Sequence, residues 1–206
     1  IQYFYKQGVA VKVISGDDPT TVAAVAQRAG IDNAHMAVDM TKVRDEDIPE
    51  AALKYTVFGR VTPNQKKMLV SELQKAGHNV AMTGDGVNDL LAMKQANCSI
   101  AVGQGSDAAR QTAQLVLLDS DFSVLKDVIA EGRRVINNLT KSVGVFFIKT
   151  IYSVLISILC IFLNTDFPFI PLQITLNDAV IEGFPAFFMS FEQNDKQVHG
   201  TFLNNA

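Results

Sequence analysis

T-G-D-G-V-N-D, residues 83–89, decides the fold, because it directly follows an apolar segment and opens a segment with helical periodicity. Gly84 and Gly86 allow the backbone to turn tightly and leave room for a phosphate. Asp85 would leave the end of a strand as a hard oxygen ligand suited to Mg²⁺. Asp89 follows one helical turn later, where it can share a cation or orient a water. The alternative is a capped turn whose acidic residues are favoured by the helix dipole.

Units of strand, turn and helix repeat on both sides of this stretch. We expect strands at about residues 9–14, 55–58, 78–82, 99–102 and 114–118, and helices at about 20–29, 63–76 and 87–96. This alternation predicts an α/β fold with a Rossmann-like parallel sheet covered by helices. Ligands of such a sheet bind at the carboxyl ends of its strands. We therefore expect the residues that follow three of these strands, at 15–17, 60–66 and 83–89, to meet in space.

Two further motifs lie at those strand ends. G-R-V-T-P-N-Q-K, residues 59–66, places Lys66 in the first turn of a helix, where its ammonium could neutralise a phosphorylated carboxylate. A solvent-exposed lysine is the alternative, since Pro-x-x-Lys is common at helix starts. S-G-D, residues 15–17, offers a hydroxyl and an amide that can hold phosphate oxygens or merely cap the next helix.

In this order the motifs resemble the T-G-D, A-R-x-x-P-x-x-K and T-G-D-G-x-N-D segments of P-type cation-transporting ATPases, in the calcium and sodium-potassium pump branch. These segments belong to a phosphorylation domain of haloacid dehalogenase type. The resemblance implies an ATP-driven pump that couples formation and hydrolysis of an aspartyl phosphate to cation transport. It implies that Asp85 binds Mg²⁺, with Asp89 as second choice. It also implies that Lys66 pairs with the phosphorylated aspartate and that Asn88 and Asp89 complete the acidic site.

The resemblance further implies contacts with ATP or with the transferred phosphoryl group by four residues, Ser15, Gly16, Asp17 and Arg60. Leu90-Leu91 departs from the Ala-Pro of many members, which bears on the subfamily. No D-K-T-G motif occurs in the sequence, and neither a T-G-E-type loop nor a nucleotide-binding domain is recognisable. An aspartyl phosphate cannot form without its aspartate. We therefore expect a fragment that is inactive without the remainder of the pump chain.

Composition separates the chain into a charged and an apolar part. An average of 48% hydrophobic residues and a net charge of −3 give no indication of a nucleic-acid partner or of a disordered tail. Residues 143–163 carry one charge, Lys149, and are long enough to cross a bilayer core of roughly 30 Å. A connector at 164–168 and a second apolar stretch at 169–191 predict a transmembrane α-helical hairpin.

We therefore expect three parts: residues 1–122 as the C-terminal part of the cytosolic phosphorylation domain, 123–142 as a stalk helix, and 143–206 as the hairpin and following loop. Four basic residues of the stalk precede the first crossing, namely Lys126, Arg133, Arg134 and Lys141. The connector at 164–168 contains no lysine or arginine. The positive-inside rule then predicts an integral membrane protein with its α/β part in the cytosol, and we expect the plasma membrane. A buried hairpin of a soluble protein is the alternative.

Asp178 and Glu182 lie four residues apart, so one helical face would carry both within the second apolar stretch. Acidic residues in a membrane span normally face a polar pathway, although a shorter span would place them in an interfacial loop. The resemblance extends to the sixth membrane helix of the pumps and implies a transported-cation site at Asp178 and Glu182. It adds Thr150 and Ser153 from the preceding helix. Calcium is possible, but the missing acid at Ser153 and the nearby Lys149 leave the ion open.

Two other functions remain compatible with the sequence. A membrane-tethered phosphatase of the haloacid dehalogenase type would share the chemistry of Lys66 and Asp85. The other is a structural or regulatory role in the membrane, performed by a truncated, non-catalytic protein. An upstream D-x-D motif favours the phosphatase, and an upstream D-K-T-G motif favours the pump.

Overall fold

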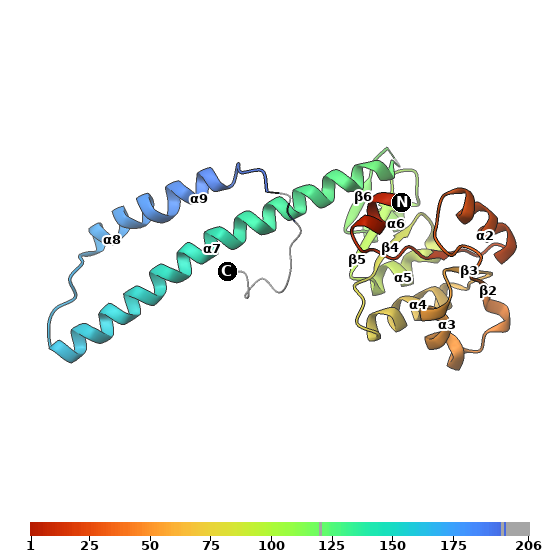
Figure 1. Ribbon diagram of the computed structural model, residues 1–206, viewed down its shortest axis with the longest axis horizontal. Coiled ribbons are helices and arrows are strands. Elements are labelled where there is room, and N and C mark those ends of the chain that lie inside the picture. Colours follow the sequence, from red (N-terminus) through yellow and green to blue (C-terminus); the bar gives the residue numbers. More distant parts are fainter. Residues whose placement is uncertain (120, 195, 197–206) are drawn as a thin grey trace. The chain divides into compact units, whose positions relative to one another are not determined.

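Within residues 1–119, 121–194 and 196, which the computed structural model describes, the strands are short, parallel and divided between two sheets (Figure 1). One sheet has the order β1-β3-β2 and consists of β1 (Val13–Ile14), β2 (Ala37–Asp39) and β3 (Val57–Gly59). The other has the order β4-β5-β6 and consists of β4 (Ala81–Gly84), β5 (Cys98–Val102) and β6 (Leu115–Leu117). The expected α/β fold with parallel strands is confirmed.

Helices connect the strands and extend the chain beyond them. Those of the α/β part are α1 (Gln2–Lys6), α2 (Pro19–Arg28), α3 (Ile48–Lys54), α4 (Pro63–Lys75), α5 (Leu90–Gln95) and α6 (Asp107–Thr112). Short 3₁₀ turns are η1 (Met40–Lys42), η2 (Asp45–Asp47), η3 (Val87–Asp89) and η4 (Phe122–Val124). They are followed by α7 (Leu125–Leu163), α8 (Pro171–Asp178), the π-helical turn η5 (Ala179–Gly183) and α9 (Phe184–Met189).

The sheets do not form the single continuous sheet that the sequence suggested, because β1 and β4 are not paired with each other. Helix α4 instead connects their cores. Leu69 packs with Phe58 in one buried cluster, whereas the next residue, Val70, packs with Met82 in another. The helix therefore packs against the cores of both sheets.

Several element boundaries differ from those expected. The strand expected at 78–82 begins at Ala81. The N–H of Val80 donates to Oδ1 of Asn97 at 2.9 Å and is therefore not used for pairing between strands. The strand expected at 9–14 is reduced to Val13–Ile14. Neither β2, which has three residues, nor α3, whose first turn contains a proline, was predicted from the sequence.

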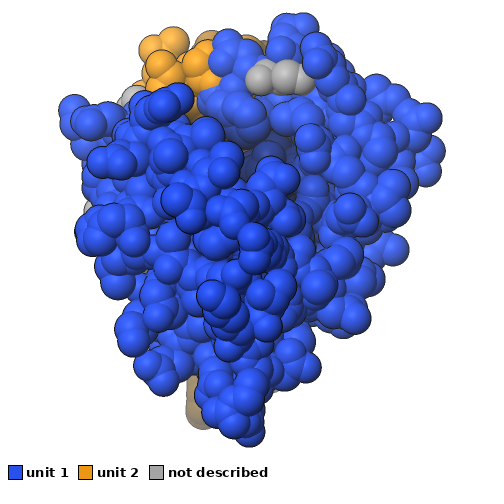
Figure 2. Space-filling model, turned by 90° about the vertical axis from the view of Figure 1, so that its right-hand side faces the viewer, with its two compact units in different colours: residues 1–122 blue, residues 123–206 orange. Residues whose placement is uncertain are grey.

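The chain divides into two compact units, Ile1–Phe122 and Ser123–Ala206 (Figure 2). In the second unit, α7 runs for 39 residues, about 58 Å, without a break between the expected stalk and the first crossing. By length and composition it is the one helix in the described part of the chain that could cross a membrane.

The second arm of the hairpin is not one regular α-helix. Helices α8 and α9 run back along α7, with the π-helical turn η5 between them (Figure 1). A π-helical turn adds a residue to one turn of helix and is often found at functional sites. Here it contains Glu182.

Candidate functional site at the strand ends

A capping box positions Lys66. The hydroxyl of Thr62 accepts the N–H of Gln65, the side chain of Gln65 accepts the N–H of Thr62, and Pro63 occupies the first helical position. The Gln65 amide also donates to the Met40 carbonyl at 3.1 Å. These contacts fix the first turn of α4 and direct the lysine that follows.

Lys66 forms a buried ion pair with Asp89. The ammonium lies 2.7 Å from Oδ1 of Asp89, and the two side chains are only 11% and 10% exposed. Oδ2 of Asp89 accepts the N–H groups of Asp85 and Gly86 at 3.3 and 3.4 Å. Asp89 therefore joins α4 to the turn after β4, with both of its oxygens occupied.

Asp85 and Asn88 are exposed beside this pair. The backbone of Asp85 is held by the N–H of Ser106, which donates to its carbonyl at 2.7 Å. Gly84 is required for a different reason from the one expected. A Cβ there would lie 2.5 Å from Cβ of Asp89, so Gly84 makes room for Asp89 and not for phosphate. A Cβ at Gly86, in contrast, would have no neighbour closer than 3.9 Å.

The Ser15–Asp17 loop is hydrogen-bonded to the end of β3. The N–H of Arg60 donates to the Asp17 carbonyl at 2.8 Å, and the N–H of Val61 donates to the Ser15 carbonyl at 3.0 Å. Within the loop, the Ser15 hydroxyl donates to the Asp17 carboxylate and accepts the Asp17 N–H, both at 3.1 Å. A Cβ at Gly16 would meet nothing within 4 Å, so the loop presents an open backbone surface.

Arg60 binds two carboxylates that the sequence analysis did not identify. Its guanidinium lies 2.7 Å from Asp18 and 3.1 Å from Asp39, and its backbone has a left-handed φ of 53°. Left-handed backbone is uncommon for a residue other than glycine and persists where surrounding contacts impose it. The position of each acid in the sequence could have identified it. Asp18 is the N-cap of α2, after the loop that follows β1, and Asp39 is the N-cap of η1, directly at the end of β2.

Hydrogen bonds lower the pKa of both carboxyls. For Asp18 the main cause is the N–H of Thr20, and for Asp39 it is the hydroxyl of Thr41, with the charge of Arg60 adding to each. Both acids therefore remain ionised as partners of Arg60.

Mg²⁺ fits part of this donor set. It usually binds through one or two carboxylates and completes its shell with waters and phosphate oxygens. Asp85 offers an exposed carboxylate, whereas Asp89 is already shared between Lys66 and two N–H groups. No group of three or more His, Cys, Asp or Glu side chains suited to a metal occurs among the described residues. Of the two, Asp85 is thus the carboxylate that no ion pair or hydrogen bond within the described part of the chain occupies, whereas Asp89 holds Lys66.

In the second unit, Lys149 reaches the two acids proposed for the transported cation. Its ammonium lies 2.7 Å from Oδ1 of Asp178 and 3.6 Å from Oε2 of Glu182. Thr150, one of the expected cation ligands, donates its hydroxyl to the Phe146 carbonyl of its own helix at 3.0 Å. Ser153 is half-buried, and its carbonyl accepts the hydroxyl of Ser157 at 2.8 Å. The structure therefore joins Asp178 and Glu182 through a lysine.

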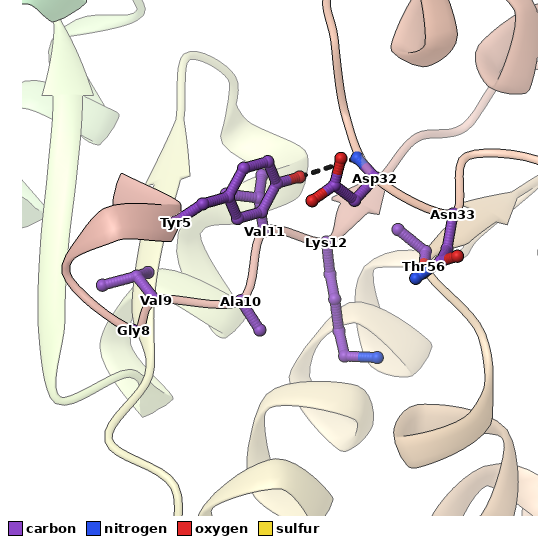
Figure 3. A pocket seen from close by; sticks show the side chains of 9 residues that line it. All are labelled: Tyr5, Gly8, Val9, Ala10, Val11, Lys12, Asp32, Asn33 and Thr56. Carbon is purple, nitrogen blue, oxygen red and sulfur yellow. Dashed lines mark hydrogen bonds between the residues drawn. The ribbon is translucent and has the colours of Figure 1, made fainter. Parts of the chain in front are cut away.

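A separate pocket of about 330 Å³ lies at the opposite ends of β1 and β3 (Figure 3). Residues 8–12 and Thr56, which precede these strands, line it together with Asp32 and Asn33. Its Tyr5 hydroxyl accepts the N–H of Asp32 at 2.8 Å. Since the motifs lie at the carboxyl ends of the strands, this pocket is not part of the candidate site.

Comparison with known proteins gives concordant results. Residues 1–97 match the family model of haloacid dehalogenase-like hydrolases. The chain is 47% identical to the probable cation-transporting ATPase exp7 of Streptococcus pneumoniae, covering 100% of this chain and 28% of that protein. It is 43% identical to the calcium-transporting ATPase CtpE of Mycobacterium bovis, covering 98% of this chain and 27% of that protein. The chain thus spans between a quarter and a third of the length of these relatives.

Among solved structures, a zinc-transporting PIB-type ATPase in the E2.Pi state superimposes with a TM-score of 0.64. The alignment covers 92% of this chain and 26% of that one at 22% sequence identity. At this identity the similarity is evidence for the fold alone.

Proposed function

Because the chain is homologous over its length to P-type cation-transporting ATPases and contains a haloacid dehalogenase-like domain, we propose that it forms part of an ATP-driven cation pump. In this proposal the pump forms and hydrolyses an aspartyl phosphate on a segment outside the chain. The chain alone does not turn over ATP, since the aspartate is absent from it. The observation that carries the proposal is the buried contact between Lys66 and Asp89.

The contact with Asp89 holds the Lys66 ammonium in a position where it could interact with a phosphoryl group. Phosphoryl transfer depends mainly on positioning and on stabilising charge spread over the phosphate oxygens. The capping box and the ion pair hold the Lys66 ammonium in place before any substrate arrives. We propose that it pairs with the phosphorylated aspartate and that Asn88, exposed on the same turn, contacts the phosphoryl group.

Mg²⁺ would be held by Asp85 in this proposal and would neutralise phosphate charge that Lys66 does not reach. The chain's own contribution is to leave the Asp85 side chain exposed, on a backbone that the N–H of Ser106 holds in position. Asp89 then supports both groups and is not itself a ligand of the metal.

The remainder of the pump chain could pair with the edges of the two sheets. Within the described residues, β1 is paired only with β3 and β4 only with β5, so each has one edge without a partner strand from that part of the chain. Such edges present unpaired N–H and C=O groups that accept a further strand. We propose that the strand bearing the phosphorylated aspartate pairs there, in the parallel sense, and delivers its aspartate to the end where Lys66 and Asp85 lie.

ATP would contact the Ser15–Asp17 loop. Gly16 leaves that loop open, and its backbone is held by the end of β3. Since the Arg60 guanidinium already binds Asp18 and Asp39, we propose that Arg60 acts chiefly by holding the loop in position and not by direct contact with a phosphate.

Helix α7 would cross a lipid bilayer, with the α/β part in the cytosol. Side chains along it are apolar and exposed, including Ile151 at 59%, Leu155 at 61% and Phe162 at 83%. In water such a surface would be unfavourable, whereas lipid solvates it. The plasma membrane is the location that we propose. The transported cation would bind at Asp178 and Glu182, with Thr150 and Ser153 contributed by the preceding helix α7. The name of the CtpE relative makes calcium the first ion to test.

The test is ATP hydrolysis by the full-length protein reconstituted into lipid vesicles, with Ca²⁺, Na⁺ and K⁺ varied one at a time. The pump proposal requires hydrolysis that one of these cations stimulates and that the 206-residue chain alone lacks. Hydrolysis of phosphate esters with no dependence on any cation would favour the membrane-tethered phosphatase. Absence of all hydrolysis would favour a non-catalytic membrane protein.

A further inference from the structure

Lys149 is the feature that the proposed pump mechanism does not use. It is the one charged residue between residues 143 and 163, and a charge in such a span is unfavourable unless it is paired. Its ammonium contacts both Asp178 and Glu182, from the facing arm of the same unit. The side chains are partly buried, with exposed fractions of 23%, 33% and 21% for the lysine, the aspartate and the glutamate.

The charges of this cluster do not cancel. Two carboxylates and one ammonium leave a net charge of −1. One carboxylate oxygen is left over, because Oε1 of Glu182 is buried and has no hydrogen-bond partner among the residues that the structure describes. An unpaired carboxylate oxygen away from water is costly and attracts a cation. The cluster is therefore only partly neutralised by the lysine.

Local backbone structure brings these groups together. Asp178 ends α8, and Glu182 lies in the π-helical turn that follows. Hydrogen bonding in that turn is not the regular α-helical pattern, so its side chains are not constrained to helical spacing. Asp178 is the closer contact of the ammonium at 2.7 Å, and Glu182 is the looser at 3.6 Å.

We propose that Lys149 is a built-in counter-ion, whose ammonium occupies the carboxylate site while no transported cation is bound. This rests on the proposed function, because it assigns Asp178 and Glu182 to the cation. An entering cation displaces the ammonium from Glu182 first, since that contact is the longer one. After the cation leaves, the ammonium returns and neutralises the site, so no counter-ion from the other side of the membrane is needed.

Competition between the ammonium and the cation gives the proposal its measurable consequence. Removing the charge of Lys149 leaves two carboxylates unneutralised, which strengthens cation binding. A merely structural ion pair has the opposite effect, because its loss disturbs the packing of α7 against the second arm and weakens binding. The sign of the change therefore separates the two roles.

The experiment is equilibrium binding of Ca²⁺, Na⁺, K⁺ and Mg²⁺, each alone, to the full-length protein in detergent. Lys149→Met should bind at least one of these ions about tenfold or more tighter than the unmodified protein. Lys149→Arg keeps the charge and should remain within about threefold of it. The double variant Lys149→Met with Glu182→Gln restores the net charge of −1 and should return towards the original affinity.

Unchanged or weaker binding of all four ions by Lys149→Met would overturn the built-in counter-ion. So would equal strengthening by Lys149→Arg, which retains the charge. ATP-dependent hydrolysis is measured separately on the same preparations. A protein that hydrolyses ATP in a cation-dependent way but shows no tighter binding in Lys149→Met refutes this inference and leaves the proposed function intact. Tighter binding without any ATP hydrolysis would refute the pump and leave the cation site.

Discussion

Replacing Lys66 by methionine would leave the carboxylate of Asp89 buried without its ion pair. Breaking a buried pair by removing one partner costs about 3–5 kcal/mol. Asp89 retains the N–H groups of Asp85 and Gly86, so we expect the lower end, about 3 kcal/mol, for the free energy of opening around α4 and β4. Methionine has a similar length and keeps the apolar contacts of the lysine stem.

The assay is hydrogen exchange of the 206-residue chain in detergent, followed in peptides that cover α4 and β4. A loss of about 3 kcal/mol corresponds to exchange about 100-fold faster. Lys75→Met is the matched control. Lys75 lies on the same helix and pairs with Glu72 at 2.6 Å, but its side chain is 69% exposed, so its loss should cost less than about 1 kcal/mol.

Equal effects of Lys66→Met and Lys75→Met would refute the reasoning. That result would mean that water reaches the contact between Lys66 and Asp89, and that the two sheets are not held together at their carboxyl ends by this pair.

Three other perturbations follow from the structure. Gly84→Ala should destabilise the first unit by about 1–3 kcal/mol, because the added Cβ would meet Asp89 and Met93. Gly16→Ala is the control, because its Cβ would meet nothing within 4 Å, and it should leave the free energy of chemical unfolding nearly unchanged. Glu182→Gln in the full-length protein should alter the cation dependence of ATP hydrolysis, while nucleotide binding stays normal; unaltered dependence would contradict the cation site. Thr41→Val should raise the pKa of Asp39, because the Thr41 hydroxyl is the main cause of its lowering. Since a lowered folded pKa gives stability above the unfolded value of about 4 that is lost as pH falls through the folded pKa, acid unfolding of Thr41→Val should begin at higher pH; an unmoved acid transition would contradict this.

The sequence was sufficient to predict those features that depend on contacts between residues close together in the chain. The capping of α4 is determined by Thr62, Pro63 and Gln65, and it placed Lys66 correctly in the first turn of a helix. The turn after β4 was likewise predicted from its glycines and aspartates. The pairing of Lys66 with Asp89 was not, because spacing along the chain does not say which of two neighbouring carboxylates faces a lysine from another helix.

Long-range partners account for the remaining differences. Arg60 was expected at a phosphate, but Asp18 and Asp39 from two other segments bind it. Lys149 was recognised as an obstacle to a simple calcium site, but its contact with Glu182 depends on a π-helical turn that no local pattern revealed. The division of strands into two sheets depends on pairing between segments far apart in sequence, which hydrophobic periodicity does not specify.

The most direct test of the central proposal is the formation of phosphoenzyme from ATP labelled at the γ-phosphate, in the full-length protein. Asp85→Asn removes the exposed carboxylate beside the buried pair, and we predict that it forms little labelled protein. Asp107→Asn is the control, because Asp107 is also an exposed aspartate of the first unit but pairs with Arg110 outside the motif. We predict that it is labelled normally. Normal labelling of Asp85→Asn, or no labelling of the unmodified protein, would contradict the proposal that these strand ends act on an aspartyl phosphate.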